Sequence, residues 1–448
     1  MTHFIATIQE ECKNISALLN INKYDVFVAI KEDIAASAKD KNPFALNASS
    51  RIFVTLRVWN SEGQVGITNT SNLTHDGLVL AFEVALNSAQ FCNTSTKYDF
   101  SPLCLDPILS STAEIESQST SIQELAQAAV ECESAILNAH ASIKSVPYNK
   151  ISQVFLEHCY FNSLNAFRHQ KTSFSHCYFY PLAQEENKIP RQLGHNSIAN
   201  NFKTLSYLQC AQTAIEKTKN HLNYEKVTTG KYMVVFSPEA FLDLVGAFSN
   251  FFNAQNILDK KSLSTTDTMN TQLSSDFLNI MDSPLHEAHI GKSFFDEEGT
   301  PTRELSILEN GVLKNFIHTS YTAQVFGTKP TGHTALGSKL TAHVHFLRIF
   351  ANKDSQNQQE PNKNSTHIYI ENVKALHAGI NALQGSFSLP FDGFIVNGEK
   401  RTSIESATIA GDFLTLLKNI IYVSPLEKVT SSGICTDIWV NDLSVTGG

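Results

Sequence analysis

Two histidines and a glutamate within four residues form the most conspicuous candidate for chemistry. They lie in HEAH, from His286 to His289, inside MDSPLHEAHIGKSFFDEEGTPTRE (281–304). A zinc-protease helix places two histidines about one turn apart, with a glutamate that activates the zinc-bound water. Here the histidines are three residues apart, and Pro284 and Gly291 flank them, which disfavours a helix. In a strand the two imidazoles would point to opposite faces. We therefore interpret HEAH as a chance match.

Two copies of HCYF, at 158–161 and 176–179, also combine histidine with cysteine. Adjacent residues on a strand face opposite sides, so only one residue of each His-Cys pair can reach a given metal ion. Two antiparallel strands with buried cysteines explain this pattern without a metal.

His343 and His345 are the best local candidates for metal ligands, although weak ones. Alternate residues of a strand share a face, so both imidazoles of HVH can approach one ion. No third ligand is identifiable nearby in the sequence. The chain has no other predicted metal ligand and no predicted catalytic residue.

An acidic run, Asp296-Glu297-Glu298, precedes Gly299 in DEEGTPTRE. Carboxylates suit hard cations, but this spacing is not that of an EF-hand loop. We predict a turn that exposes the carboxylates and leads into the strand that ends in LENG.

The elements expected to position these residues begin with an N-terminal α+β half. Phe4, Ile5, Ile8 and Cys12 recur at helical spacing and predict an amphipathic first helix. Further on, Ser121 and Glu124 have the spacing of a capping box. The other expected elements are strands at 24–31, 51–59, 64–70, 151–161 and 173–181, a helix from Thr74, and a helix at 204–221.

The second half is predicted to be rich in sheet. A strand ending at Phe236 meets Ser237-Pro238, and proline at the first helical position predicts a helix over 238–256. Asn-Gly pairs at 310–311 and 397–398 predict hairpins. The polar stretch 352–365 is predicted to be a flexible surface loop. The predicted fold class is α+β. We assign an N-terminal α+β domain to 1–225 and a β-rich C-terminal domain, with the central helix, to 226–448.

Composition excludes several classes of protein. The chain has 448 residues, 42% of them hydrophobic, and a formal charge of -9, without the concentrated basic face of a nucleic-acid binder. No stretch approaches the roughly 20 apolar residues of a membrane span. The N-terminus lacks the pattern of a signal peptide, and the eight cysteines include no CxxC pair. We expect a cytoplasmic protein with reduced thiols that contacts neither DNA nor membrane.

The C-terminal features together resemble one family. SFFDEEGTPTRELSILENGVLKNFIHTSYTAQVFGTKPTGH is similar to the signature of the TldD/PmbA proteins, long labelled modulators of DNA gyrase, in which an acidic turn leads into an ENG hairpin, a helix and a Thr-Gly turn. GQVGITNTSNLTHDGLVLAFEVAL, TTGKYMVVFSPEAFLDLV and FDGFIVNGEKRTSIESATIAGDFLTLLKNI resemble other family segments in the same order, as does the terminal WVNDLSVTGG. The resemblance is strongest from about residue 226 onward.

The resemblance also implies a branch of the family. The TldD branch carries HExxxH on the helix after the central strand, with a later cysteine, and is a zinc-dependent peptidase. The PmbA branch, also called TldE, lacks this motif and forms a heterodimer with its sister. The corresponding helix here, FLDLVGAFSNFF (241–252), contains no histidine, and Asp243 is its only carboxylate. Cys435 lies close to the last predicted strand. The chain therefore resembles the PmbA/TldE branch.

This resemblance implies a subunit without metal or cofactor of its own, paired with a zinc-bearing TldD-type chain that cleaves unfolded or extended peptides. The alternatives are a homodimeric peptide-binding or scaffold protein without catalysis, and an autonomous hydrolase that uses another site, such as one around His343 and His345. The signature turns would either fix the fold or line a substrate groove. Their residues are Asp296, Glu297, Glu298, Gly299, Thr331 and Gly332.

Overall fold

The computed structural model describes most of the chain. The described residues are 2–91, 97–108, 120–337, 340–352, 358, 360–362 and 364–448. Cys92 therefore lies outside them, as does much of the loop predicted at 352–365. The fold is mixed α+β, as predicted.

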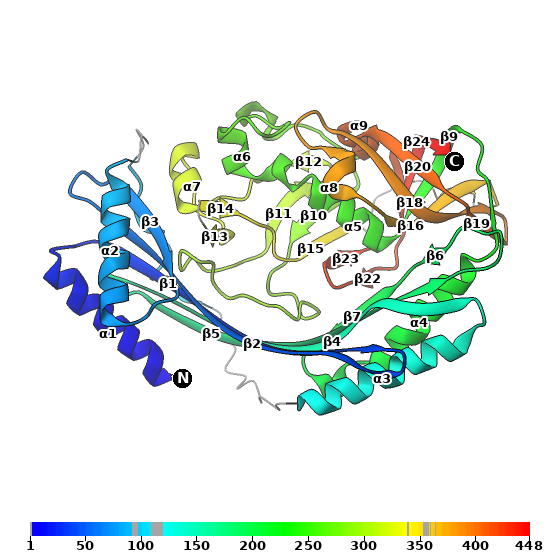
Figure 1. Cartoon of the computed structure of the whole chain (residues 1–448). Helices are drawn as coiled ribbons and strands as arrows, with labels where there is room; N and C mark the ends of the chain where they lie inside the picture. Colours follow the sequence, from blue (N-terminus) through cyan, green and yellow to red (C-terminus); the bar gives the residue numbers. More distant parts are fainter. Residues whose placement is uncertain are drawn as a thin grey trace.

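A curved antiparallel sheet forms the base of the molecule and bends around the C-terminal part (Figure 1). The strand order is β3-β2-β1-β4-β5-β6, and β7 also pairs with β5. The strands are β1 (Tyr24–Lys39), β2 (Asn42–Trp59), β3 (Val65–Thr70), β4 (Ile143–Asn162), β5 (Phe167–Ala183), β6 (Arg191–Gln192) and β7 (His195–Ala199). The pairing of β4 with β5 is antiparallel, with Cys159 and Cys177 buried, which confirms the two predicted antiparallel strands with buried cysteines.

The alternation along β1 explains why this sheet is covered on both faces. Val26 and Val28 pack with the core that contains α1 and α2, whereas Phe27 packs on the opposite side with Phe295 of the C-terminal part. Asp25 is buried at the start of the same strand. Successive side chains of a strand point to opposite faces, so β1 supplies both the outer core and the junction with the C-terminal part.

The helices of the first half pack in pairs at the two ends of the long strands (Figure 1). Thr74 caps the second helix, and the predicted capping box of Ser121 and Glu124 is present at the third. The helices are α1 (Thr2–Leu18), α2 (His75–Ala89), α3 (Ile122–Ala139) and α4 (Tyr207–Asn220). No helix in the described part of the chain is long and apolar enough to cross a membrane.

In the described residues, the C-terminal part contains sheets of nine, six and two strands, and the two larger sheets share one large core. The nine-stranded sheet contains β8 (Tyr224–Glu225), β9 (Gly230–Phe236), β16 (His367–Val373), β17 (Ile380–Asn381), β18 (Ser386–Asn397), β19 (Lys400–Ile404), β20 (Ala407–Asp412), β21 (Ile420–Val423) and β24 (Ile438–Gly447). The six-stranded sheet contains β10 (Leu278–Asp282), β11 (Leu305–Glu309), β12 (Val312–Leu313), β15 (Leu347–Ala351), β22 (Lys428–Val429) and β23 (Gly433–Cys435), and the small sheet β13 (Thr334–Leu336) and β14 (Leu340–Ala342).

The prediction of a single helix over 238–256 is wrong, because the helix is interrupted at two places. Phe248 ends the first helix and a 3-10 turn follows. The Asn253 side chain then accepts hydrogen bonds from two backbone N–H groups and starts a separate short helix. Asparagine competes with the backbone in this way and favours caps over helix interiors. The helices of this part are α5 (Pro238–Ala247), α6 (Ala254–Leu258), α7 (Ser320–Phe326), α8 (Leu376–Gly379) and α9 (Phe413–Lys418).

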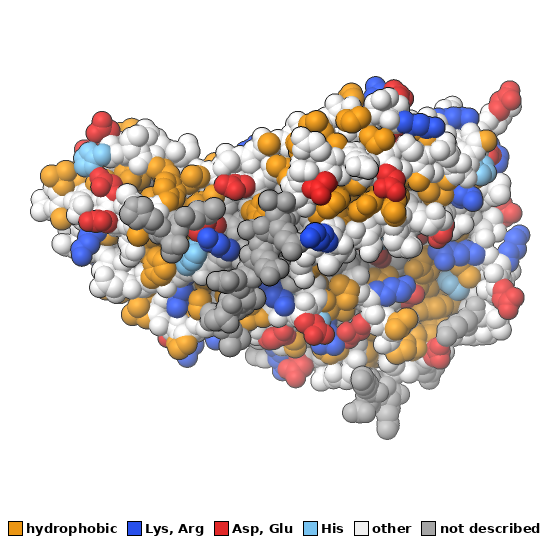
Figure 2. Space-filling view, turned by 90° about the horizontal axis from the view of Figure 1, so that it is seen from below, with side chains coloured by type: hydrophobic (Ala, Val, Ile, Leu, Met, Phe, Trp, Pro, Cys, Tyr) orange, Lys and Arg blue, Asp and Glu red, His pale blue; other side chains and the backbone are white. Residues whose placement is uncertain are grey.

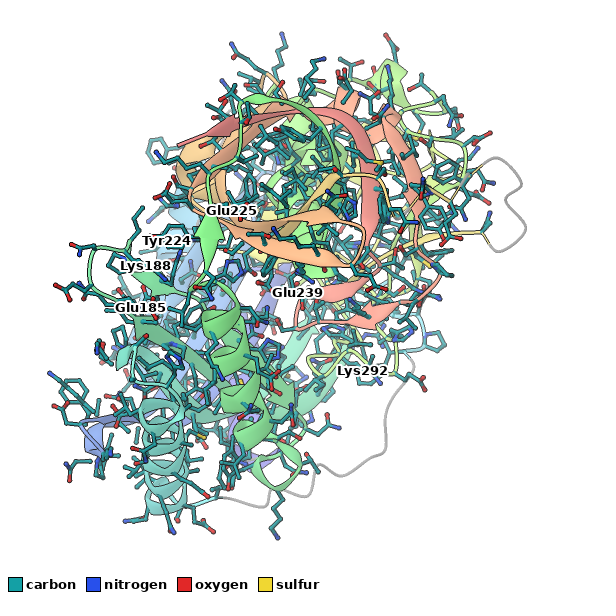
Figure 3. The ribbon with its side chains drawn as sticks, turned by 90° about the vertical axis from the view of Figure 1, so that its right-hand side faces the viewer. Glu185, Lys188, Tyr224, Glu225, Glu239 and Lys292 are labelled. Carbon is teal, nitrogen blue, oxygen red and sulfur yellow. The ribbon has the colours of Figure 1, made fainter. Side chains whose placement is uncertain are left out.

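Both predicted hairpins form. Asn310 and Gly311 have φ values of 50° and 76° between β11 and β12. In the second hairpin Asn397 pairs with Lys400, so the turn begins at Gly398, one residue later than the Asn-Gly pair indicates. The division into domains at residue 225 stays a prediction. In the structure, β8 pairs with β19, and Tyr224 and Glu225 lie where the chain passes between its two parts (Figure 3).

Candidate functional site

A cavity of about 450 Å³ lies between helix α5 and the strand edge formed by β6 and β7. Figure 3 places Glu239 between the C-terminal sheets and α4. Consecutive residues 192–198 line one wall, and 429–432 contribute to another. The cavity therefore follows an extended stretch of backbone at the edge of the N-terminal sheet.

Helix α5 presents two carboxylates to this cavity. Glu239 and Asp243 both line it, and residues four apart lie on one face of a helix. Burial and the charge of Glu239 raise the pKa of Asp243 to about 6. The Asp243 side chain is nevertheless accessible to solvent, because it faces the cavity and not the core. Sequence reasoning predicted the helix from Pro238 but missed Glu239, because the comparison with the HExxxH helix covered only 241–252 and left out the first turn.

The opposite wall carries basic side chains. Burial and the charge of Lys217 lower the pKa of His195, while Glu239 across the cavity acts in the opposite direction. The Lys217 ammonium lies 3.8 Å from Oε1 of Glu371, and the other oxygen of that carboxylate, Oε2, lies 2.9 Å from His221 Nε2. The cavity thus combines charges of both signs with polar backbone.

The donors around α5 do not match the zinc site of an HExxxH helix. The helix carries no histidine, so it offers neither of the two imidazoles. Cys435 lies close enough for the charge of Glu239 to raise the pKa of its thiol, although burial raises it more. Its Sγ is buried and donates to the carbonyl of Thr436. Within the described residues, these carboxylates and this thiol do not form a group with the spacing of metal ligands.

The acidic run forms the predicted turn, but two of its carboxylates are buried. Asp296 accepts hydrogen bonds from the N–H groups of Glu298 at 2.9 Å and Thr334 at 3.0 Å. Burial and the Glu298 charge raise the pKa of Asp296 to about 7, against these donors. Burial also raises the pKa of Glu297 to about 7, although it accepts from the Leu336 N–H. The expectation that this turn exposes its carboxylates is therefore wrong for Asp296 and Glu298.

Glu298 joins this turn to the N-terminal sheet. Arg57 Nη1 donates to it at 2.5 Å, and the other side of the Arg57 guanidinium donates to both oxygens of Asp25. Glu298 also accepts from the Ser320 N–H and the Thr334 hydroxyl, each at 2.8 Å. These side chains are almost fully buried, and no sequence pattern links Arg57 to a residue 241 positions later. The two buried carboxylates thus share one guanidinium, and backbone and hydroxyl donors from the C-terminal part also bond to Glu298.

The two signature glycines permit close backbone approaches. Gly299 has φ +72°, and a Cβ there would lie 2.4 Å from the Tyr160 ring. Gly332 has φ +79°, and its Cβ would lie 2.6 Å from the carbonyl oxygen of Pro301. Next to it, the Thr331 hydroxyl accepts from the His318 N–H at 2.7 Å. Both glycines thus allow the turns to pack directly against other segments of the chain.

The HEAH stretch forms a series of turns, neither helix nor strand. The imidazoles of His286 and His289 both stack on Phe346, with ring centroids 6.3 and 4.6 Å away. The expectation for a strand, with the two rings on opposite faces, therefore does not apply. Ala288 and Ile290 reach the rim of the α5 cavity.

The pair His343 and His345 does not share a strand face. β15 begins only at Leu347, and His343 is exposed. The predicted strand fails here because the His345 N–H bonds to the Asp282 carboxylate at 2.9 Å and not to a neighbouring strand. His345 lies instead beside His333, with ring centroids 5.1 Å apart. Sequence reasoning missed both Asp282 and His333, although both lie in strings singled out for other reasons.

Comparisons with known proteins agree with one another along most of the chain. Residues 229–447 match a family model described as the PmbA/TldA metallopeptidase C-terminal domain, and residues 115–222 match the central domain of the same family. The chain is 23% identical over 444 residues to "Metalloprotease PmbA" of Escherichia coli O157:H7, covering 93% of this chain and 94% of that protein.

Solved structures show the same fold. A structure described as a putative modulator of a DNA gyrase, from Thermotoga maritima, superimposes with a TM-score of 0.84 at 22% identity and covers 99% of this chain and 100% of that one. TldE from Thermococcus kodakarensis superimposes with a TM-score of 0.83 at 17% identity, covering 98% and 100%.

Proposed function

This chain belongs to the PmbA/TldD metallopeptidase family, and we propose that it is a PmbA/TldE-like subunit without catalytic metal. It would pair with a zinc-bearing TldD-type chain and help to enclose unfolded or extended peptides for cleavage. The observation that carries this proposal is α5, which faces the cavity with Glu239 and Asp243 and has no imidazole. A zinc peptidase needs imidazole ligands and a positioned base at such a place.

The form of the cavity supports an extended peptide as ligand. Seven consecutive residues, 192–198, line it along the β6–β7 edge. Backbone groups at a sheet edge bind an extended peptide through main-chain hydrogen bonds, with little dependence on its side chains. The carboxylates of Glu239 and Asp243 would attract the amino terminus or a basic side chain of that peptide.

Charge distribution argues against nucleic acid as the ligand. The formal charge is -9, and on the face shown in Figure 2 basic and acidic side chains are interspersed. A protein that follows a phosphate backbone concentrates its cations. The proposal therefore includes no direct contact with DNA.

The test is peptidase activity on an unfolded polypeptide, measured for this chain, for a TldD-type chain from the same source, and for their mixture. We expect no cleavage by this chain alone and cleavage by the mixture. Replacing the glutamate of HExxxH in the partner should abolish that cleavage. Cleavage by the isolated chain would overturn the proposal in favour of an autonomous hydrolase. If the mixture is inactive and this chain forms homodimers in it, the result would favour a homodimeric peptide-binding scaffold.

The contribution of the cavity is tested in the active mixture. Glu239→Gln with Asp243→Asn should raise KM and leave kcat nearly unchanged, because these residues would bind the peptide without taking part in the chemical step. Glu225→Gln is the matched control, since Glu225 is exposed on β8 outside the cavity. A loss of kcat with an unchanged KM would contradict this role.

A further inference from the structure

Three residues from separate segments converge beside the small sheet. Asp282 ends β10, His333 precedes β13, and His345 lies between β14 and β15. One donor atom from each lies within 4.8 Å of the others, and the described residues contain no other such group of three. We propose that Asp282, His333 and His345 bind a divalent first-row transition-metal ion, at a site separate from α5 and independent of the proposed function.

The carboxylate is held so that one oxygen is directed at the cluster. Asp282 Oδ1 accepts from the N–H groups of His345 at 2.9 Å and Phe346 at 2.8 Å. Asp282 Oδ2 lies 2.9 Å from His333 Nε2. Two backbone donors thus fix the orientation of the carboxylate from behind and leave Oδ2 facing the imidazole.

Each imidazole has an outer partner for its other nitrogen. His333 Nδ1 lies 2.9 Å from the Thr331 hydroxyl oxygen, which can accept its proton. His345 Nε2 donates to the Gly332 carbonyl at 2.7 Å, which leaves the lone pair on Nδ1. Histidines that ligate metals almost always hydrogen-bond through the second nitrogen in this way, which fixes the tautomer and the ring orientation. The signature turn at 331–332 thereby supplies the outer contacts of the site.

The donor set selects the class of ion. Two neutral imidazoles and one carboxylate suit zinc, cobalt, nickel or iron, whereas magnesium and calcium prefer sites built from oxygen. Asp282 and His333 are buried, and His345 is half-buried. Three protein ligands leave at least one coordination position for water.

The alternative is a hydrogen-bonded cluster that ties three segments together without an ion. Titration distinguishes the two. Chelator-treated chain, alone and without peptide, is titrated with Zn²⁺ by calorimetry and with Co²⁺ by visible absorption. We expect one equivalent of either ion to bind. Co²⁺ should develop the visible d–d bands of an ion held by nitrogen and oxygen ligands, and Mg²⁺ should not compete.

Variants locate the site. His345→Gln should weaken Zn²⁺ binding by more than about tenfold, because it removes a ligand at a half-buried position. His343→Gln is the matched control, since His343 is an exposed histidine two residues away, and it should bind like the wild type. Asp282→Asn keeps the shape of the side chain and should also lose the ion. If Asp282→Asn does not fold, the His345 and His343 variants still decide the question.

Failure of wild-type chain to bind a stoichiometric equivalent of Zn²⁺ or Co²⁺ would overturn the proposal. Equal binding by wild type and His345→Gln would overturn it too, because the ion would then lie elsewhere. Neither result bears on the peptidase assay, which measures cleavage by the mixture.

Discussion

Two groups of carboxylates lie near the junction between the N- and C-terminal parts, and they differ in how their charge is balanced. Glu298 is buried against Arg57, with further donors from Ser320 and Thr334. Glu239 and Asp243 face a cavity, and no hydrogen bond or ion pair to either side chain is found among the described residues.

The difference separates residues that hold the fold from residues available to a ligand. A buried charge persists only when its partners are in place, so the acidic turn depends on the N-terminal sheet. A carboxylate that faces water in a cavity can bind a ligand without such support. An acidic string is thus a poor guide to function until the environment of each oxygen is known.

The largest effect is expected when the shared cation of the buried group is removed. Arg57→Ala leaves both Asp25 and Glu298 without their guanidinium partner, and the loss of one partner of a buried ion pair costs about 3–5 kcal/mol. Denaturant unfolding measures the change in free energy. Arg51→Ala, at an exposed position on the same strand, should change it by less than about 0.5 kcal/mol. Similar losses for both variants would contradict the comparison.

The next test makes the same substitution, glutamate to glutamine, in each of the two environments. Glu298→Gln should destabilise the chain by about 1.5–3 kcal/mol, since it weakens several charge-assisted hydrogen bonds in a buried site. Glu239→Gln should lie within about 0.5 kcal/mol of wild type. The free energies of unfolding of both variants are compared in one buffer. Equal values would remove the distinction between the two groups.

The geometry of the acidic turn is tested at its glycine. Gly299→Ala should cost about 1–3 kcal/mol, because it adds a clash with Tyr160 to the strain of a positive φ. Gly398→Ala separates the two causes, since Gly398 has φ +60° but open space around its Cβ position. It should cost about 1 kcal/mol. A Gly398 variant as unstable as the Gly299 variant would assign the whole effect to backbone strain.

The smallest effect is expected for Asp243, and it depends on pH. Its pKa in the folded chain, about 6, lies above the usual value of 3.8, so the folded state favours the protonated form. Asp243 therefore contributes stability below about pH 4 that is lost as the pH rises to 6. Asp243→Asn should stabilise the chain at pH 7.5, by no more than about 1 kcal/mol because solvent screens the site. The gain should vanish near pH 4.

The cause of this shift can be checked separately. Titration of Asp243 followed by carbon NMR should show a lower pKa in Glu239→Gln than in wild type, because the neighbouring negative charge is removed. An unchanged pKa would assign the shift to burial alone.

The sequence by itself determined the fold class and most local elements, because their signals act over a few residues. The capping box of Ser121 and Glu124 and the Asn310-Gly311 hairpin need only contacts three or four positions apart. The absence of histidine from the helix after β9 is likewise a property of the sequence. The capping box and the hairpin can be predicted because residues that are neighbours along the chain make the bonds that stabilise them.

Only the tertiary structure decided which side chains meet. Asp282 reaches residues 51 and 63 positions further along the chain, and Arg57 reaches Glu298 across 241. The strand expected at His343 and His345 fails because the Asp282 carboxylate takes the N–H of His345. Contacts of this range depend on how sheets and turns pack, and no spacing in the sequence encodes them.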